Sequence, residues 1–300
     1  MSSFNGERYI EEQIESILHQ TGVEVSLFIR DDGSADRTPY ILSKYSSKGH
    51  VDVTYGRNIG IGNSFMKRLY SVPGDYDYYA FSDQDDIWEE NKLSAAVCRL
   101  KEETGCALYA SDLECVDADD NRIGMRFEGE KPFDCSLLSL ICRNYCYGCT
   151  QVFNKNLFLL LLRSKPSKQL LKARMHDSWV AVSAAAAGRI IFERDSHIRY
   201  RRHGGNYTNF DRGETALWKV RFSKLIHRER RNPSSKMAKE VLRHYAACVE
   251  NNADRDLICS LAQPRTIKNR FSLIRCRKRF AEYSDISKSW FAFKVIAGVI

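Results

Sequence analysis

The chain has 300 residues, and its 46 Lys and Arg against 38 Asp and Glu give a formal net charge of +8. A hydrophobic fraction of 43% with 28% charged residues is typical of a globular protein with a full core, and 17 Gly and 6 Pro exclude a collagen-like or low-complexity chain. No run reaches the ~18 uninterrupted apolar residues of a membrane-spanning helix.

The amino terminus and the cysteines indicate the compartment. The first residues lack the basic and then apolar segments of a signal peptide, so we expect a cytoplasmic protein. Its 10 cysteines are then expected to be free thiols, many of them in the core. Cys142, Cys146 and Cys149 lie close together, but only the last two approach the spacing of a zinc site.

Charge divides the chain into two regions. Residues 211–300 hold 20 Lys and Arg against 9 Asp and Glu, a net charge of +11, whereas residues 1–210 hold 26 against 29, a net charge of −3. A stretch rich in Gly, Asn and Asp near 206–213 reads as a loop between them. We therefore predict one domain at 1–208 and a basic, mainly helical region at 209–300.

Apolar spacing predicts alternating helices and strands. In chain order we expect a helix at 7–20, a strand at 25–29, a helix at 38–46, a strand at 51–55, a helix at 63–70, a strand at 78–81, a helix at 89–103 and a strand at 107–110. This order predicts an α/β fold with a mostly parallel sheet, in which ligands bind at the carboxyl ends of the strands. Helices at 157–163 and 178–187 and strands at 189–193 and 198–201 follow.

Acidic side chains follow the third predicted strand, as Asp83-Gln84-Asp85-Asp86. In an extended backbone Asp83 and Asp85 point to the same side, where two carboxylates attract a cation such as Mg²⁺ or Mn²⁺. A solvated acidic loop is the alternative. The apolar strand before the cluster and Ile87-Trp88 after it favour an anchored site.

A second acidic pair, Asp31 and Asp32, follows the first predicted strand. A carboxylate in this position can accept hydrogen bonds from an N–H or hydroxyl group of a ligand. The alternative is a turn that leads into a helix, for which Ser34 and Asp36 are good N-caps.

Two segments of the second half also carry chemistry. Asp177 begins a small-residue helix, whose dipole keeps the carboxylate ionised and able to act as a general base, and Trp179 offers a flat face for a sugar ring. Simple capping by Asp177 is the alternative. His203 follows two arginines that can meet phosphate, although a lone histidine is more often structural.

Together, in this order, these segments resemble a family 2 glycosyltransferase of the GT-A fold. The matching runs are SFNGE at 3–7, DDGS at 31–34, Asn58 with Gly60, SDQDDIW at 82–88, GCT at 148–150, His176-Asp177 and YRRH at 200–203. The SDQDDIW and H-D-x-W forms resemble the bacterial rhamnosyltransferase-like branch. The resemblance implies a Rossmann-like central sheet flanked by helices, with the domain at 1–208 binding the nucleotide-sugar and carrying out catalysis.

The resemblance also implies a role for each matching residue. Asp177 would be the general base, and Trp179 would contact the acceptor. A divalent metal, Mn²⁺ or Mg²⁺, would be held by Asp85 and His203. The residues implied to bind the nucleotide-sugar are Phe4, Asp31, Asp32, Arg57 and Asp83.

The activity that the resemblance implies is transfer of one sugar from a dTDP- or UDP-sugar, with rhamnose as one option, to a hydroxyl of a glycan or lipid-linked acceptor. The displacement would be inverting and metal-assisted, and it would serve surface polysaccharide synthesis. The Gln-x-x-Arg-Trp motif and spanning helices of processive synthases are missing from the sequence, which favours transfer of a single sugar.

The amino terminus departs from the family pattern. Family members usually begin with a full apolar strand, whereas only Met1 to Ser3 precede Phe4 here. Either the true start lies upstream, or the chain is shortened and its base-binding site is compromised.

Basic and bulky apolar residues interleave at 270–280, and a second aromatic run follows at 290–296. Such a stretch suits an anionic membrane surface, where lipid-linked acceptors would lie. We therefore expect peripheral attachment at the inner face of the cell membrane. A solvated helical face packed on the rest of the protein is the alternative.

Two other functions compete with this interpretation. A nucleic-acid-binding protein would use the basic tail on phosphates, but it leaves the acidic clusters unexplained, so no nucleic acid is expected as a partner. An inactive family member that only binds or scaffolds is made plausible by the short amino terminus.

Overall fold

The structure is a computed structural model that describes residues 1–47, 49–129, 134–204, 232–250, 252–284 and 288–296. The chain forms two compact units. Unit 1 comprises residues 1–131, 146–163 and 189–209, and unit 2 comprises residues 132–145, 164–188 and 210–300. Segments of the predicted first domain thus belong to unit 2. The predicted boundary at 208/209 lies outside the described residues and stays a prediction.

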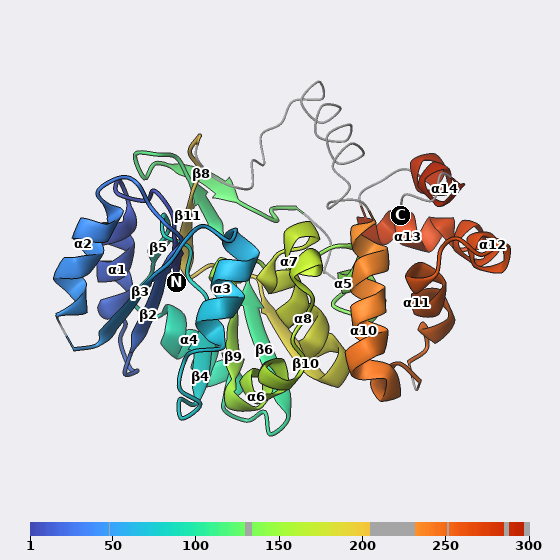
Figure 1. Ribbon diagram of the computed structural model, residues 1–300, viewed down its shortest axis with the longest axis horizontal. Helices are drawn as coiled ribbons and strands as arrows, with labels where there is room; N and C mark the ends of the chain where they lie inside the picture. Colours follow the sequence, from blue (N-terminus) through green and yellow to red (C-terminus); the bar gives the residue numbers. More distant parts are fainter. Residues whose placement is uncertain (48, 130–133, 205–231, 251, 285–287, 297–300) are drawn as a thin grey trace. The chain divides into compact units, whose positions relative to one another are not determined.

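Unit 1 begins with three parallel strands in the order β1-β2-β3 (Figure 1). They are β1 (Ser2–Ser3), β2 (Leu27–Asp31) and β3 (Val51–Tyr55), and they are joined by α1 (Ile10–Leu18) and α2 (Thr38–Ser46). The two crossovers from β1 to β2 and from β2 to β3 are right-handed, so α1 and α2 cover the same face of this sheet. The next helix, α3 (Ile61–Leu69), lies on the opposite face. Ile10, Ile14 and Ile17 are buried because they repeat at helical spacing.

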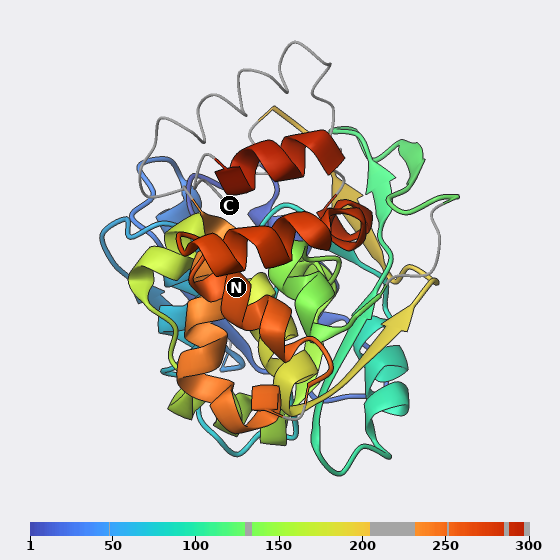
Figure 2. The same cartoon turned by 90° about the vertical axis from the view of Figure 1, so that its right-hand side faces the viewer.

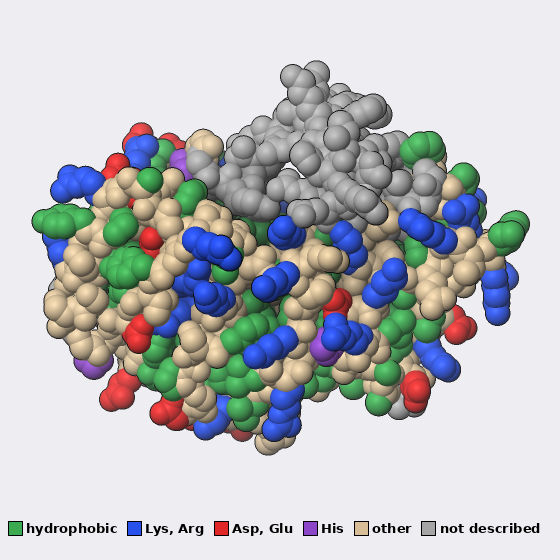
Figure 3. All heavy atoms as spheres, in the orientation of Figure 1, with side chains coloured by type: hydrophobic (Ala, Val, Ile, Leu, Met, Phe, Trp, Pro, Cys, Tyr) green, Lys and Arg blue, Asp and Glu red, His purple; other side chains and the backbone are tan. Residues whose placement is uncertain are grey.

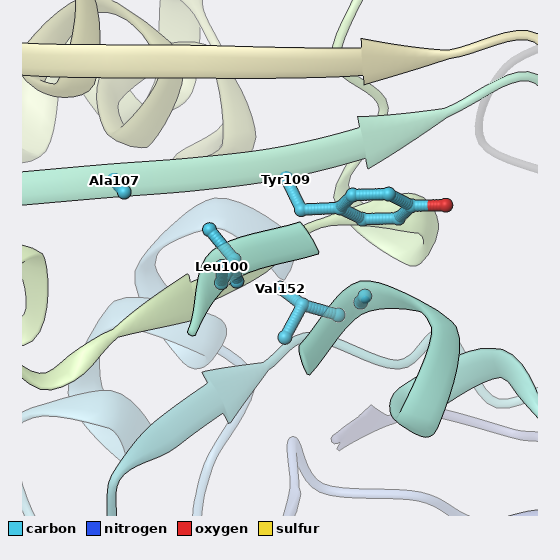
Figure 4. Packing of buried hydrophobic residues seen from close by; sticks show 5 residues of the cluster. Leu100, Ala107, Tyr109 and Val152 are labelled. Carbon is cyan, nitrogen blue, oxygen red and sulfur yellow. The ribbon is translucent and has the colours of Figure 1, made fainter. Parts of the chain in front are cut away.

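The second sheet of unit 1 has the order β10-β6-β9-β4. Its strands are β4 (Tyr78–Ala80), β6 (Cys106–Ser111), β9 (Val152–Asn154) and β10 (Gly188–Glu193), and the helices of this part are α4 (Lys92–Leu100) and α6 (Lys155–Arg163). Figure 4 shows Leu100 of α4 packed with side chains of β6 and β9, among them Tyr109 and Val152. Strand β9 runs antiparallel to both neighbours, so its start lies beside the end of β4.

A third sheet, in the order β5-β11-β7-β8, completes unit 1. Its strands are β5 (Ile87–Trp88), β7 (Glu114–Val116), β8 (Arg122–Met125) and β11 (Ile198–Arg201). Strand β11 is parallel to β7 and antiparallel to β5, with Arg199 opposite Ile87. This register places the end of β11 beside the residues just before β5.

Unit 2 is helical and is centred on α8 (His176–Ala187). Residues 176–184 of α8 are all buried, which its small side chains permit, and the helix packs against α5 (Leu137–Cys142) and α10 (Pro233–Glu250). Figure 2 turns the C-terminal helices toward the viewer. The other helices are α7 (Lys168–Ala173), α11 (Arg255–Ala262), α12 (Ile267–Arg275), α13 (Arg277–Ser284) and α14 (Lys288–Ile296).

The predicted elements are present, with differences at their ends. The helix at 38–46 and the strands at 51–55 and 198–201 have the predicted bounds. The helix expected at 7–20 spans only Ile10–Leu18, because the chain before it forms a turn with Asn5 at a positive φ of 49°. Several ladders beyond the first sheet are antiparallel, since the chain leaves unit 1 and re-enters it before β9 and β10.

Candidate active site

The acidic loop after β4 is anchored to helix α1. Gln13 of α1 donates from Nε2 to Ser82 Oγ at 2.7 Å, and Ser82 Oγ donates to the Asp83 carbonyl at 2.8 Å. Asp83 and Asp85 are half-buried, whereas Asp86 is buried. The loop is therefore a fixed feature of the carboxyl edge of the sheet, as expected for an anchored site.

The end of β11 and the residues after it bring Arg201 and His203 to this loop. His203 Nε2 lies 2.9 Å from Asp85 Oδ2, so the two residues predicted to share a metal do meet. The buried Arg201 side chain donates from Nε to the Asp85 carbonyl at 3.2 Å and from Nη2 to Glu12 Oε2 at 2.6 Å. The Arg201 backbone N–H donates to Asp86 Oδ1 at 3.2 Å. The end of β11 thus fixes both Asp85 and Asp86.

A three-residue donor set joins the acidic loop to the turn before β9. Asp83, Asp86 and Cys149 each offer one ligand atom, and these atoms all lie within 4.8 Å of one another. Cys149 is close because it precedes β9, whose start faces the end of β4. Carboxylates suit Mg²⁺ or Mn²⁺, and a thiolate is a softer donor, so the set fits a divalent transition ion such as Mn²⁺.

Burial governs the ionisation of this cluster. Burial, together with the charges of Asp85 and Asp83, raises the pKa of Asp86 well above its usual value. Burial also lowers the pKa of Lys92 to about 8. The Lys92 ammonium lies 3.9 Å from the centre of the Trp88 ring, where a cation–π contact stabilises its charge. Burial therefore disfavours the charged forms of both Asp86 and Lys92, and the neighbouring carboxylates add to this effect at Asp86.

The amino-terminal loop joins the acidic loop through Gln84. The Phe4 N–H donates to Gln84 Oε1 at 2.8 Å, and Gln84 Nε2 donates to the Phe4 carbonyl at 3.1 Å. A Cβ at Gly6 would lie 2.4 Å from Gln84 Oε1, so a larger residue at this position would push the Gln84 side chain out of this pairing. The Phe4 side chain is 45% exposed, which leaves its ring available for stacking.

Asp31 organises the turn that follows β2. It is buried, and its Oδ2 accepts from the N–H groups of Gly33 and Ser34 at 3.2 and 3.0 Å. Its Oδ1 accepts from Ser3 Oγ at 3.1 Å. The carboxylate therefore joins the ends of β1 and β2 and shapes the turn after β2, as the alternative interpretation of this segment expects. Its predicted contact with a base or ribose stays a prediction.

Asp32 holds a neighbouring loop. It is buried and paired with Arg30, and it accepts from the N–H groups of Ile59 and Gly60, the latter at 3.0 Å. Arg30 also donates to the Arg57 carbonyl at 3.1 Å, and the Arg57 side chain is exposed at this edge. Asp32 thus positions the loop that presents Arg57, and a nucleotide role for either residue remains a prediction.

The sequence profile of the family called Glycosyl transferase family 2 matches residues 1–158, more than half of the chain. The chain belongs to glycosyl transferase family 2. The predicted resemblance is thereby confirmed, and the protein is a glycosyltransferase.

Two bacterial relatives match most of this glycosyltransferase. The dTDP-rhamnosyl transferase RfbG of Shigella flexneri is 29% identical over 242 residues, which cover 75% of this chain and 78% of the relative. An uncharacterized glycosyltransferase of Rickettsia typhi is 25% identical over 236 residues, which cover 75% of this chain and 71% of the relative.

Solved structures share the fold of this glycosyltransferase. The crystal structure of S. aureus TarS 1-349 in complex with UDP matches with a TM-score of 0.55 at 17% identity, covering 94% of this chain and 79% of that chain. The complex of TarS 1-349 with UDP-GlcNAc matches with a TM-score of 0.56 at 17% identity, covering 99% and 90%. At this identity the likeness speaks for the fold, and it confirms the predicted α/β class of the GT-A type.

Unit 2 of the glycosyltransferase holds Asp177. The side chain lies in the first turn of α8, is 8% exposed, and accepts a hydrogen bond from Asn144 Nδ2 at 3.0 Å. The Arg174 guanidinium donates to the carbonyls of Ile141 and Cys142 at 2.8 and 2.6 Å and holds α5 next to this turn. Asp177 is therefore a positioned carboxylate, as a general base must be, and its role in catalysis stays a prediction.

Trp179 lies in the core of unit 2. Its side chain has 0% exposure, its Nε1 donates to the Ser164 carbonyl at 3.0 Å, and its ring stacks on Tyr245 at 5.7 Å. This placement goes against the predicted acceptor contact, because a ring with no exposed surface cannot pack on a sugar. Trp179 is therefore a core residue of unit 2, on a helix whose residues 176–184 are all buried.

The C-terminal helices of unit 2 carry exposed apolar side chains. Ile267 and Phe271 of α12 are 76% and 72% exposed, and Phe293 and Ile296 of α14 are also exposed. Lys and Arg side chains are dispersed over the face in Figure 3. Among the described residues, no helix is long and apolar enough to cross a membrane.

Sequence reasoning missed several residues of the site. In the sequence Asp86 looks like one more member of the acidic run. Its burial and its hydrogen bond from the Arg201 N–H distinguish it from the half-buried Asp83 and Asp85. Lys92 and Cys149 gave only weak signals, a lysine in a helix and a cysteine in the GCT run. Cys149 approaches the acidic loop because β9 runs antiparallel to β4, which local patterns did not indicate.

Proposed function

We propose that this glycosyltransferase moves one sugar from a dTDP- or UDP-sugar, with rhamnose as the leading candidate, to a hydroxyl of a glycan or lipid-linked acceptor, in surface polysaccharide synthesis. The observation that carries the proposal is the cluster of Asp83, Asp85 and Asp86 at the carboxyl edge of the sheet, held by Arg201 and His203. The relative RfbG, a dTDP-rhamnosyl transferase, supports a dTDP-sugar, and TarS, which was solved in complex with UDP, supports a nucleotide donor.

The donor would lie along the carboxyl edge of unit 1. Phe4 has an exposed ring for the base, and Arg57 has an exposed guanidinium next to the same edge. The turn that Asp31 organises and the loop that Asp32 holds give these side chains fixed positions. Because these loops are tied by buried carboxylates, little conformational entropy would be lost when the donor binds.

The leaving diphosphate would face the acidic loop. Asp83, Asp85 and Asp86, with Cys149 or His203 beside them, would hold a divalent cation, Mn²⁺ or Mg²⁺, which when bound supplies positive charge for the diphosphate. Without such a partner, phosphates and carboxylates would repel one another. Arg201 keeps the loop in place through its backbone and side-chain hydrogen bonds.

The chemical step would be a single displacement with inversion. The acceptor oxygen forms a bond to the anomeric carbon while the bond from that carbon to the diphosphate oxygen breaks, and the nucleoside diphosphate leaves with the electron pair. The hydroxyl proton goes to the Asp177 carboxylate, which Asn144 orients.

The protein would act at the inner face of the cell membrane, to which the exposed apolar and basic residues of α12 would attach it peripherally.

The test is a thermal-shift panel with dTDP and UDP, each with and without Mn²⁺. We expect Mn²⁺-dependent stabilisation by at least one nucleotide in the native chain, and its loss in Asp85→Asn. Asp195→Asn is the matched control, because Asp195 is an exposed carboxylate outside the acidic loop. Equal stabilisation of both variants would contradict the metal role of the loop, and binding without turnover of any donor would instead identify an inactive family member.

A further inference from the structure

One side chain joins two loops of unit 1 that lie 80 residues apart in the sequence. Gln84 stands between Asp83 and Asp85 in the acidic loop, and its amide pairs with both backbone groups of Phe4, accepting from the N–H at 2.8 Å and donating to the carbonyl at 3.1 Å. The pairing does not use the Phe4 ring, which is 45% exposed. The acidic loop therefore fixes the backbone that carries this ring.

Gly6 leaves the space that the Gln84 side chain occupies. A Cβ at Gly6 would lie 2.4 Å from Gln84 Oε1, 2.6 Å from Cδ and 3.0 Å from Nε2, and these are the three atoms nearest to it. Gly6 has no positive φ, so its backbone conformation is open to any residue. Contact with Gln84 is therefore the reason for a glycine at this position.

The segment at 4–7 is also held on its other side, by the turn after β2. The Asn5 N–H donates to Ser34 Oγ at 2.9 Å, and Asn5 Oδ1 accepts from the Ala35 N–H at 2.9 Å. These hydrogen bonds are independent of the acidic loop. Loss of the Gln84 side chain would therefore shift the segment relative to the acidic loop without unfolding it.

We propose that Gln84 is a positioning residue that couples cation binding at the acidic loop to binding of the nucleotide base at Phe4. The inference rests on the proposed function. Asp83 and Asp85 flank Gln84, so their binding of a cation would order the backbone between them, and the two hydrogen bonds of Gln84 extend that order to Phe4. When one ligand has ordered a segment, a second ligand of the same segment loses less conformational entropy on binding.

Such coupling is reciprocal, because each ligand changes the affinity for the other by the same factor. A bare nucleoside reveals it, since thymidine and uridine carry no phosphate that could contact the cation directly. Inorganic pyrophosphate is the complementary probe, because it can contact the cation but carries no base.

The experiment measures binding of thymidine, uridine and pyrophosphate by titration calorimetry, each with and without Mn²⁺. The variants are Gln84→Ala, which removes the pairing with Phe4, and Gly6→Ala, whose new methyl group displaces Gln84 without changing the acidic loop. The double variant completes the cycle. Gln169→Ala, at an exposed glutamine of α7 in unit 2, is the matched control.

We expect Mn²⁺ to strengthen nucleoside binding by about fivefold or more in the native chain and in Gln169→Ala. This gain should be absent in Gln84→Ala, while pyrophosphate with Mn²⁺ binds to all variants equally well. Gly6→Ala should also lose the gain. The double variant should be no worse than Gln84→Ala, because the added methyl group then has no Gln84 side chain to displace.

A gain of native size in Gln84→Ala would overturn the proposal. A parallel loss of pyrophosphate binding would also overturn it, since that result indicates a structural role, and so would additive effects of the two substitutions. A native chain that binds pyrophosphate with Mn²⁺ but whose nucleoside binding ignores Mn²⁺ would exclude the coupling and leave the proposed function standing. A native chain that binds neither probe would contradict the proposed function itself.

Discussion

Single buried groups decide much of the chemistry of this glycosyltransferase. Asp31 and Asp32 are buried carboxylates whose oxygens accept from backbone N–H groups of the two loops at the carboxyl edge. A buried ionised group is stable only when it is paired or hydrogen-bonded, so these residues hold the loops in one arrangement. Asp177 lies at the start of a helix instead, where it accepts from the Asn144 side chain and from the N–H of the next residue.

Replacement of Asp177 tests the proposed base. We expect Asp177→Asn to keep nucleotide binding and to lower kcat by roughly 10²–10⁴-fold, because the amide cannot take a proton. Donor binding is measured by thermal shift and transfer by release of nucleoside diphosphate. Asn144→Ala should cause a smaller loss, since it removes only the orienting hydrogen bond. Full activity of Asp177→Asn would exclude it as the base.

The pH dependence of stability tests the burial of His176. Burial lowers the pKa of His176 from 6.5 to about 3. Between these values the unfolded chain binds one more proton than the folded chain, so the free energy of unfolding rises with pH through this window and its gain is complete above 6.5.

We expect His176→Gln to flatten this rise by about 1.4 kcal/mol per pH unit, measured by urea unfolding at several pH values. His50→Gln, which replaces an exposed histidine, should keep the native slope. An unchanged slope in His176→Gln would show that the imidazole is not buried in its neutral form.

At the scale of elements, β9 and β11 build the site by their direction. The antiparallel course of β9 brings Cys149 to Asp83, and the register of β11 with β5 brings Arg201 and His203 to Asp85. The sequence predicted the strand at 198–201 but none at β9, and it indicated the neighbours of neither. Strand pairing over such separations depends on the whole sheet rather than on local patterns.

Arg201 tests the link between β11 and the acidic loop. Its guanidinium donates to the Asp85 and Ala118 carbonyls and to Glu12. We expect Arg201→Lys to lower the free energy of unfolding by about 2 kcal/mol, because an ammonium cannot reproduce the planar fork. Arg99→Lys, at a half-exposed position with a long ion pair, should change it by less than about 0.5 kcal/mol. Similar values for both variants in urea unfolding would contradict this role.

Helix α12 tests the proposed membrane attachment. Ile267 and Phe271 are four residues apart, so they share one face, with the exposed Lys268 and Arg275 nearby. We expect Phe271→Ser to lower binding to vesicles of anionic lipid several-fold, since apolar insertion and charge act together. Tyr40→Ser, at an exposed aromatic position of unit 1, is the matched control. Equal binding of both variants would exclude α12 as the anchor.

At the scale of the whole molecule, charge separates the competing functions. The net charge of +8 attracts any polyanion, but attraction to phosphates alone falls steeply with salt. The acidic loop of unit 1 belongs to a family 2 glycosyltransferase and has no use in a nucleic-acid-binding protein. We therefore keep a membrane surface as the proposed partner of the basic C-terminal region.

We expect retention on DNA at about 50 mM salt to disappear by about 200 mM, while Mn²⁺-dependent nucleotide binding persists. Fluorescence anisotropy with a labelled duplex and thermal shift with dTDP measure the two properties. Tight DNA binding at the higher salt would support the nucleic-acid alternative.

Local patterns determined the class of fold and the composition of the site. Apolar periodicity placed the helices and strands, and the runs SDQDDIW and DDGS marked the carboxyl edge because polar residues follow buried strands there. Tertiary structure decided which residues meet and which are hidden. The sequence indicated Trp179 as a surface for a sugar, but in the structure its ring is buried against Tyr245. Cys149 comes close to Asp83 only because β9 pairs with β4. Burial and contact between distant residues arise from the packing of the whole unit, which a local spacing rule does not contain.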